Sequence, residues 1–235
     1  GEMNTLPTAT TPLAGFEVYT KERSGIFPHA KVQMVSVATM LDKPAKQLMT
    51  TGAVTKRNYV QKRAGIKASF HHIIGAVIIE LDSDGDHFCR HLIADETDGS
   101  FQDLTRIASQ GAVTDGHRVE VITHGDLHTE SIDATIAKAV WGVTPHEVAK
   151  GLWSSRSEDR ADSVVSILRP VHQFLHDTSD FKVRNHHNIK DPVFRFKQWH
   201  RGDECVAASY KDIAEFLKHI AATRGNVHAV ASNHD

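Results

Sequence analysis

"VITHGDLHTESID" occupies residues 121–133 and changes, after Thr123, from a mostly β-branched apolar run to polar residues. The run predicts a short strand over 119–123, because β-branched side chains favour extended structure. Asp126 and His128 follow at positions i and i+2, where an extended loop directs both side chains to one side. A carboxylate and an imidazole placed together after a strand are typical of a metal site.

Predicted strands over 171–175 and 227–231 are followed by residues of the same kinds. The ligand-type residues are Asp126 and His128 after the first strand, Asp177 and Asp180 after the second, and Asn233, His234 and Asp235 after the third. In strand–helix–strand folds ligands bind at the carboxyl ends of the strands, which parallel neighbours bring to one edge. These residues are therefore expected to form one site. Mixed oxygen and nitrogen ligands suit manganese, iron or zinc, and a pair of ions about 3.5–4 Å apart clamps a transferring phosphoryl group.

Helical patterns separate these strands. The stretch 129–142 predicts a helix with acidic residues in its first turn and Gly142 near its end. The stretch 144–153 predicts a second helix, with Thr144 as its N-cap and Pro145 at its first position. The stretch 208–225 has the pattern of an amphipathic helix that Gly225 stops.

The first half of the chain has a different pattern. Strands over 74–81 and 87–93, joined by the turn "DSDG", predict a β-hairpin. Residues 98–104 carry polar caps that favour a short helix or turn. A polar break at 114–117 predicts two regions, a β-rich region over 1–115 and a strand–helix region over 116–235.

Composition narrows the class of protein. The chain has 235 residues, of which 40% are hydrophobic and 24% charged, with a net charge of −2, so no overall basic excess indicates nucleic-acid binding. Two cysteines provide no disulfide framework and indicate a reducing compartment. No apolar run reaches membrane-spanning length, and a membrane is not an expected partner. The 17 histidines are unusual and gather beside aspartates.

The order of these motifs resembles the calcineurin-like metallophosphoesterases, whose pattern is Asp-x-His, Gly-Asp-x-x-Asp and Gly-Asn-His-Asp/Glu. The corresponding stretches are "GDLH", "HDTSD" and "SNHD", in which His176 and Ser232 replace the two glycines. More narrowly, residues 52–81, 176–192 and 230–235 resemble the pre-early host-DNA-degradation proteins of large tailed phages. The resemblance implies an α/β (α+β) chain, a partial calcineurin-like αββα sandwich preceded by a β-rich N-terminal region.

The resemblance also implies roles for the strand-end residues and two divalent ions, Mn²⁺ first, with Fe, Zn and Mg as alternatives. Asp126 and His128 match ligands of the first ion, Asp177 matches the ligand that bridges both ions, and Asn233 matches a ligand of the second ion. His234 matches the acid that assists the leaving group. Asp180 and Asp235 match residues that orient these groups. The implied activity is a phage DNase that hydrolyses phosphodiesters in the host cytoplasm. A non-catalytic module that binds DNA or a host protein, and a nucleotidase or phosphomonoesterase, are the alternatives.

Two basic or histidine-rich stretches are candidates for substrate binding. Arg184, His186 and His187 lie beside the second motif, and a polar loop without this role is an equal alternative. Lys56 and Arg57 flank Tyr59 in a basic stretch that suits a nucleic-acid backbone, although a solvated surface loop explains it slightly better.

The family pattern continues beyond the third motif with further histidines, whereas this sequence stops at Asp235. The expectation is a C-terminal truncation and an incomplete two-ion site that binds manganese more weakly than a longer chain. The sequence leaves the metal, the polarity of cleavage and the oligomeric state open.

Overall fold

The structure is a computed structural model that describes residues 6–43, 45–145, 153–182, 185 and 188–230. The chain divides into two compact units, Gly1–Asp115 and Gly116–Asp235, here called unit 1 and unit 2. Helices and several small sheets occur together, so the predicted mixed α/β class is confirmed. No helix within the described ranges is long and apolar enough to cross a bilayer.

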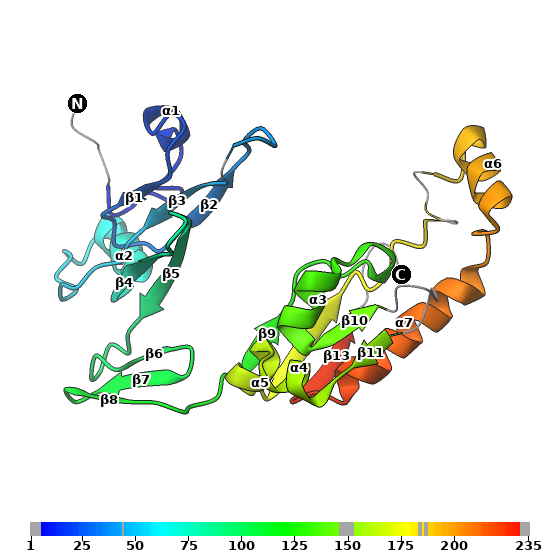
Figure 1. Ribbon diagram of the computed structural model, residues 1–235. Helices are drawn as coiled ribbons and strands as arrows, with labels where there is room; N and C mark the ends of the chain where they lie inside the picture. Colours follow the sequence, from blue (N-terminus) through cyan, green and yellow to red (C-terminus); the bar gives the residue numbers. More distant parts are fainter. Residues whose placement is uncertain (1–5, 44, 146–152, 183–184, 186–187, 231–235) are drawn as a thin grey trace. The chain divides into compact units, whose positions relative to one another are not determined.

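Unit 1 is rich in β-structure (Figure 1). Its elements are α1 (Phe16–Tyr19), β1 (Gly25–Phe27), β2 (Met34–Val37), β3 (Lys46–Thr50), α2 (Arg63–His71), β4 (Gly75–Leu81), β5 (His87–Ile93), β6 (Phe101–Asp103), β7 (Arg106–Ser109) and β8 (Ala112–Thr114). The strands form a sheet of order β1-β3-β2, the hairpin β4-β5 and an antiparallel sheet of order β6-β7-β8. Leu13, Phe27 and Leu48 form its core cluster.

The predicted hairpin is confirmed as β4 and β5, whose seven residue pairs run from Gly75↔Ile93 to Leu81↔His87. The helix or turn predicted for 98–104 is wrong, because residues 101–103 form β6 and pair antiparallel with β7. Leu104 turns the chain between these strands with a φ of 52°. Polar caps describe local preference only, and pairing with a neighbouring strand overrides it.

Unit 2 is built on a three-stranded parallel sheet. Its elements are β9 (Val121–Thr123), η1 (Thr129–Ser131), α3 (Ala134–Trp141), β10 (Val143–Pro145), β11 (Trp153–Ser155), α4 (Ser157–Ala161), α5 (Val164–Leu168), β12 (His172–His176), α6 (Pro192–Arg201), α7 (Val206–Ala221) and β13 (Asn226–Val230). The strand order is β13-β12-β9, with β12 parallel to both neighbours. The prediction of parallel strands separated by helices is confirmed.

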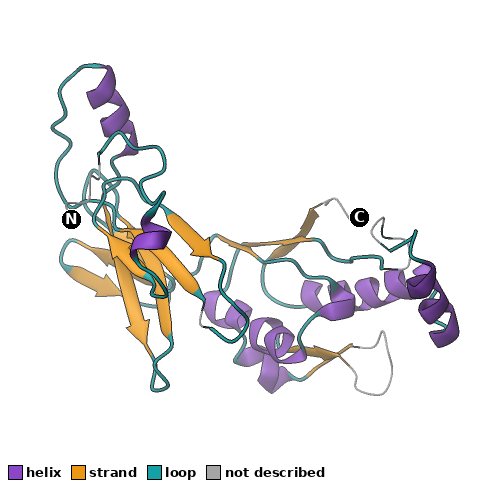
Figure 2. Cartoon of the chain, turned by 90° about the horizontal axis from the view of Figure 1, so that it is seen from above, coloured by secondary structure: helices purple, strands orange, loops and turns teal. Residues whose placement is uncertain are grey.

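Burial along β12 alternates, as a strand with one covered face requires. Gln173 and Leu175 are fully buried, whereas the residues between and beside them are half-buried. Leu175 shares one core cluster with Trp141 of α3, Val165 of α5 and Phe216 of α7. The helices of this unit accordingly lie to one side of the three strands (Figure 2).

Two predicted helices of unit 2 need correction. The helix predicted for 144–153 is wrong where the structure describes it, because Thr144 and Pro145 lie in β10, which pairs antiparallel with β11. Gly142, with a φ of 67°, ends α3, and the buried Val143 then packs into the core. The helix predicted from 129 begins later, because Asp133 caps α3 by accepting hydrogen bonds from two backbone amides of its first turn.

Trp153 and Asp212 form a half-buried polar contact beside this core. The indole Nε1–H of Trp153 donates to Asp212 Oδ1 at 2.8 Å. Burial, the largest effect, raises the pKa of Asp212, the bond from Trp153 lowers it, and the charge of Glu130 raises it further. Because the folded-state pKa is raised, the contribution of Asp212 to stability is full at low pH and is lost as pH rises through that pKa.

Asp212→Asn is therefore expected to raise the free energy of unfolding at pH 7, because the amide keeps an acceptor for Trp153 and carries no charge. The gain should disappear as pH falls towards 4, where Asp212 itself becomes neutral (about pH 3.9 for a free aspartate). Urea unfolding of both proteins between pH 4 and 7 measures this difference. Asp162→Asn, at an exposed position, is the control. A gain that does not change with pH would contradict the assignment.

Candidate metal centre

The strand ends of unit 2 bring two carboxylates and one imidazole together. Asp126 follows β9, His176 is the last residue of β12, and Asp177 comes next. His176 Nδ1 lies 3.3 Å from Asp126 Oδ1 and 3.1 Å from Asp177 Oδ2. One ligand atom from each of the three residues lies within 4.8 Å of the others. This set is called the Asp126–His176–Asp177 group below.

Backbone hydrogen bonds join the two loops that carry the group. The amide of His128 donates to the carbonyl of Asp177 at 2.8 Å, and that of Thr129 donates to Thr178 at 3.0 Å. His128 and Asp177 have φ values of 40° and 47°, in the left-handed region. Non-glycine residues in this region are uncommon and concentrate at functional sites, where the surrounding structure holds them. The loops therefore form a constrained scaffold for the group.

Glu130 organises the loop that follows Asp177. Its carboxylate accepts hydrogen bonds from the Ser179 hydroxyl, from the Asp180 amide at 3.3 Å and from the Phe181 amide at 3.1 Å. Ser179 is fully buried, so these bonds satisfy groups that water does not reach. Asn185 in turn donates to the carboxylate of Asp180. Glu130 is a positioning residue that the sequence analysis did not identify.

The charges of the group influence one another. The pKa of His176 is raised, first by its hydrogen bond to Asp177 and further by the negative charges of Asp126 and Asp177, while partial burial opposes the rise. The side chains differ in exposure, at 64% for Asp126, 34% for His176 and 15% for Asp177. The two carboxylates give the group a negative charge that attracts cations. The exposed side chain of Asp126 keeps the group accessible from solvent.

The donor set fits a divalent transition metal. Two carboxylate oxygens and one imidazole nitrogen are the mixture that manganese, iron and zinc accept, whereas magnesium and calcium prefer oxygen alone. Within the described part of the chain, the group offers ligands for one ion. The two-ion arrangement implied by the resemblance therefore stays a prediction.

The structure places the predicted site residues as follows. Asp126 and Asp177 belong to the group, and Asp180 lies in the adjoining loop. Asn233, His234, Asp235, Arg184, His186 and His187 lie outside the described residues. Lys56 is an exposed residue of unit 1. Arg57 also belongs to unit 1. Its guanidinium donates to the His72 carbonyl at 2.7 Å and forms an ion pair with Glu96, and both partners lie in the same unit.

His176 joins Asp126 and Asp177 in the group, a role that the sequence analysis did not predict for it. Among the described residues, the grouped ligand atoms include His176 and do not include His128. His128 has a left-handed φ of 40°, so the backbone there is not extended as predicted, and the role of His128 as a metal ligand stays a prediction. The signal for His176 in the sequence is its position at the end of a predicted strand, directly before Asp177. The comparison of motifs explains His176 only as a replacement for a glycine.

The fold and the site together define a mixed α/β protein with a candidate metal-binding group at the carboxyl ends of a parallel sheet. The chain is 36% identical over 239 residues to "Protein A1" of Escherichia phage T5. The match covers the whole chain and 40% of that phage protein, so the chain spans less than half the length of this relative. No protein-family model matches the chain, and no solved structure matches it. The similarity supports the bacteriophage context that the sequence predicted.

Proposed function

We propose that the protein is a metal-dependent phosphoesterase that hydrolyses DNA phosphodiesters. The observation that carries this proposal is the Asp126–His176–Asp177 group at the carboxyl ends of β9 and β12. The similarity to a phage protein is compatible with DNA degradation in the host cytoplasm. Membership of the calcineurin-like family belongs to the proposal and rests on the motif order in the sequence.

The residues divide the work according to their positions. Asp126, His176 and Asp177 would hold a divalent ion, with manganese preferred. A bound ion of this kind acts as a Lewis acid that stabilises negative charge on phosphoryl oxygens. Asp177, the least exposed of the three, anchors the set, and Glu130 keeps the following loop in place through its bonds to residues 179–181. Asp126, the most exposed, lies at the side open to a substrate.

His176→Ala is expected to lower manganese affinity at least about tenfold, because it removes the only nitrogen ligand of the group. Isothermal titration or the electron paramagnetic resonance signal of free Mn²⁺ measures the loss. His200→Ala, at an exposed histidine of α6, is the matched control and should bind manganese normally. Equal manganese affinity in both variants would overturn the assignment of the group.

Activity separates the phosphodiesterase from the phosphomonoesterase alternative. Bis(p-nitrophenyl) phosphate and a DNA duplex should be hydrolysed with manganese and not with EDTA, whereas p-nitrophenyl phosphate should react poorly. The reverse preference would favour a nucleotidase or phosphomonoesterase. The phage T5 relative is assayed beside the 235-residue chain, because the chain spans 40% of the length of that relative.

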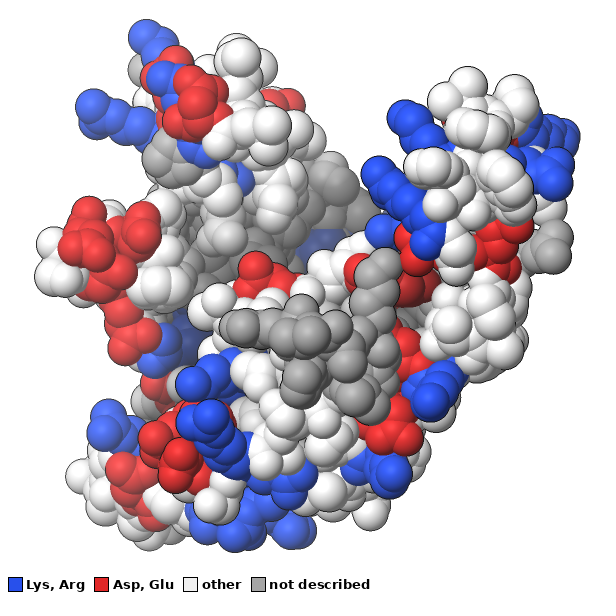
Figure 3. Space-filling model, turned by 45° about the vertical axis from the view of Figure 1, so that its right-hand side comes forward, with Lys and Arg blue, Asp and Glu red and all other residues white. Residues whose placement is uncertain are grey.

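A second candidate function, a DNA-binding module without cleavage, is favoured by α6. This helix exposes Val193, Phe196 and Trp199, which are 60%, 62% and 63% exposed. Arg195 and Lys197 lie exposed among them. Figure 3 shows basic side chains, in blue, on both sides of uncharged ones, in white, at the end of unit 2 that carries α6. Exposed aromatic rings beside cations stack bases and contact phosphates. DNA binding that is lost in Trp199→Ala, without metal-dependent hydrolysis, would favour this function.

A further inference from the structure

A pocket of about 760 Å³ lies in unit 2, away from the candidate metal centre. Its lining comes from residues 116–118, 169–171 and 224–226. These segments precede or begin β9, β12 and β13. The three strands are parallel, so the pocket lies at their amino ends while the Asp126–His176–Asp177 group lies at their carboxyl ends. The five residues of β12 separate the two edges by roughly 16 Å.

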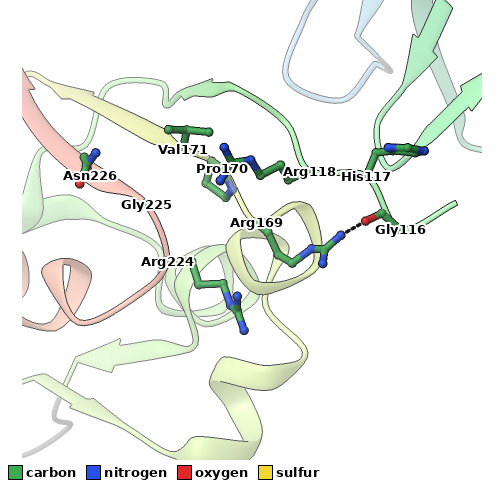
Figure 4. Close-up of a pocket in the computed structure, with 9 residues that line it drawn as sticks. All are labelled: Gly116, His117, Arg118, Arg169, Pro170, Val171, Arg224, Gly225 and Asn226. Carbon is green, nitrogen blue, oxygen red and sulfur yellow. Dashed lines mark hydrogen bonds between the residues drawn. The ribbon is translucent and has the colours of Figure 1, made fainter.

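The pocket is basic. Each of the three segments contributes one arginine, namely Arg118, Arg169 and Arg224, and none of the nine lining residues is acidic. Arg169 donates to the carbonyl of Gly116, which orients its guanidinium without neutralising it (Figure 4). Arg224 is exposed, and neither Arg169 nor Arg224 forms an ion pair with any residue that the structure describes. Arg169 and Arg224 therefore bring positive charge to the pocket.

The wall of the pocket is held by the backbone. The amide of Asn226 donates to the carbonyl of Val171 at 2.8 Å, and the amide of Val171 donates to Glu120 at 3.1 Å. Gly225 has a φ of 93°, and a Cβ at this position would lie 2.8 Å from the carbonyl oxygen of Pro170. Only glycine allows this close approach, which joins the second and third segments. The arginines thus extend from a preformed frame.

We propose that this pocket binds phosphate groups, presented either by a free nucleotide or by the backbone of a nucleic acid. Guanidinium groups match phosphate oxygens through paired, charge-assisted hydrogen bonds. The volume lies within the range of about 300–1,000 Å³ that is typical of small-ligand sites. The inference does not depend on the proposed function, because binding at the amino ends of the strands requires neither metal nor hydrolysis.

The test measures binding in the presence of EDTA, so that metal-dependent cleavage plays no part. Titration calorimetry measures the binding of inorganic phosphate and of dAMP. Fluorescence anisotropy measures the binding of a fluorescein-labelled 20-base-pair duplex. Arg224→Gln is expected to weaken phosphate-ligand binding about tenfold, and Arg224→Glu should weaken it further. Arg156→Gln, at an exposed arginine outside the pocket, should bind like the wild type.

The outcomes separate the two ligand sources. Loss of dAMP binding in the Arg224 variants identifies a nucleotide site. Binding of the duplex alone, with a slope of log K against log salt that falls by about one unit in Arg224→Gln, identifies a nucleic-acid backbone site. Amide shifts of Gly225 and Asn226 on addition of phosphate provide a readout in the unaltered protein. Unchanged binding in both Arg224 variants, or an equal loss in Arg156→Gln, would overturn the proposal.

Discussion

Asp177→Asn is expected to lower manganese affinity about a hundredfold or more and to abolish manganese-dependent DNA cleavage. Asparagine has nearly the same shape and lacks the negative charge that a divalent ion requires. Asp177 is the least exposed carboxylate of the group and lies 3.1 Å from His176 Nδ1. No other described residue of the group combines a charge with so little exposure to water. Its loss should therefore have the largest effect on the site.

The same variant has a readout that does not require metal. The hydrogen bond that His176 donates to the carboxylate of Asp177 is the first cause of the raised pKa of His176, so this pKa should fall in Asp177→Asn. Titration of the His176 ring by NMR measures the change, and Asp162→Asn, at an exposed carboxylate, is the matched control. Full manganese affinity and cleavage in Asp177→Asn would rule out the proposed site, even if the His176 pKa shifts.

Gln173→Leu is expected to destabilise unit 2 by roughly 3 kcal/mol, since each buried polar group left without a partner costs about 1–3 kcal/mol. Gln173 is fully buried in the middle strand, β12. Its Oε1 accepts from Trp141 Nε1 at 3.1 Å and from His124 Nε2 at 3.0 Å. Its Nε2 donates to Thr223 Oγ1 at 3.1 Å and to the Arg224 carbonyl at 2.7 Å.

The direction of these bonds is fixed by chemistry. An indole N–H only donates, so the atom that faces Trp141 must be the amide oxygen, and His124 must then donate through Nε2. Burial lowers the pKa of His124, against the effect of the bond to Gln173, so its neutral form is favoured. Leucine fits the space and satisfies none of these groups.

Urea unfolding followed by tryptophan fluorescence measures the loss of stability in Gln173→Leu. Gln198→Leu, at a half-buried glutamine of α6, is the matched control and should change stability by less than about 0.5 kcal/mol. A similarly small change in Gln173→Leu would show that the network contributes little. Because small domains are stable by only about 5–15 kcal/mol, the expected loss is a large fraction of the total.

The sequence by itself determined the elements whose signals are local and repeated. The β4-β5 hairpin follows from alternating residues around "DSDG", and β9, β12 and β13 follow from short apolar runs separated by helical patterns. The rule that parallel strands bring their carboxyl ends together then placed Asp126 near Asp177.

Only the tertiary structure decided features that depend on a partner distant in the chain or on a single backbone angle. Residues 101–103 and 143–145 became strands because β7 and β11 pair with them, which local caps cannot reveal. The position of His176 beside Asp126 and Asp177 depends on the pairing of β9 with β12 and on the left-handed backbone at Asp177. The arginine pocket combines three segments about 50 residues apart. Such contacts form when the chain folds back on itself, so no local pattern in the sequence records them.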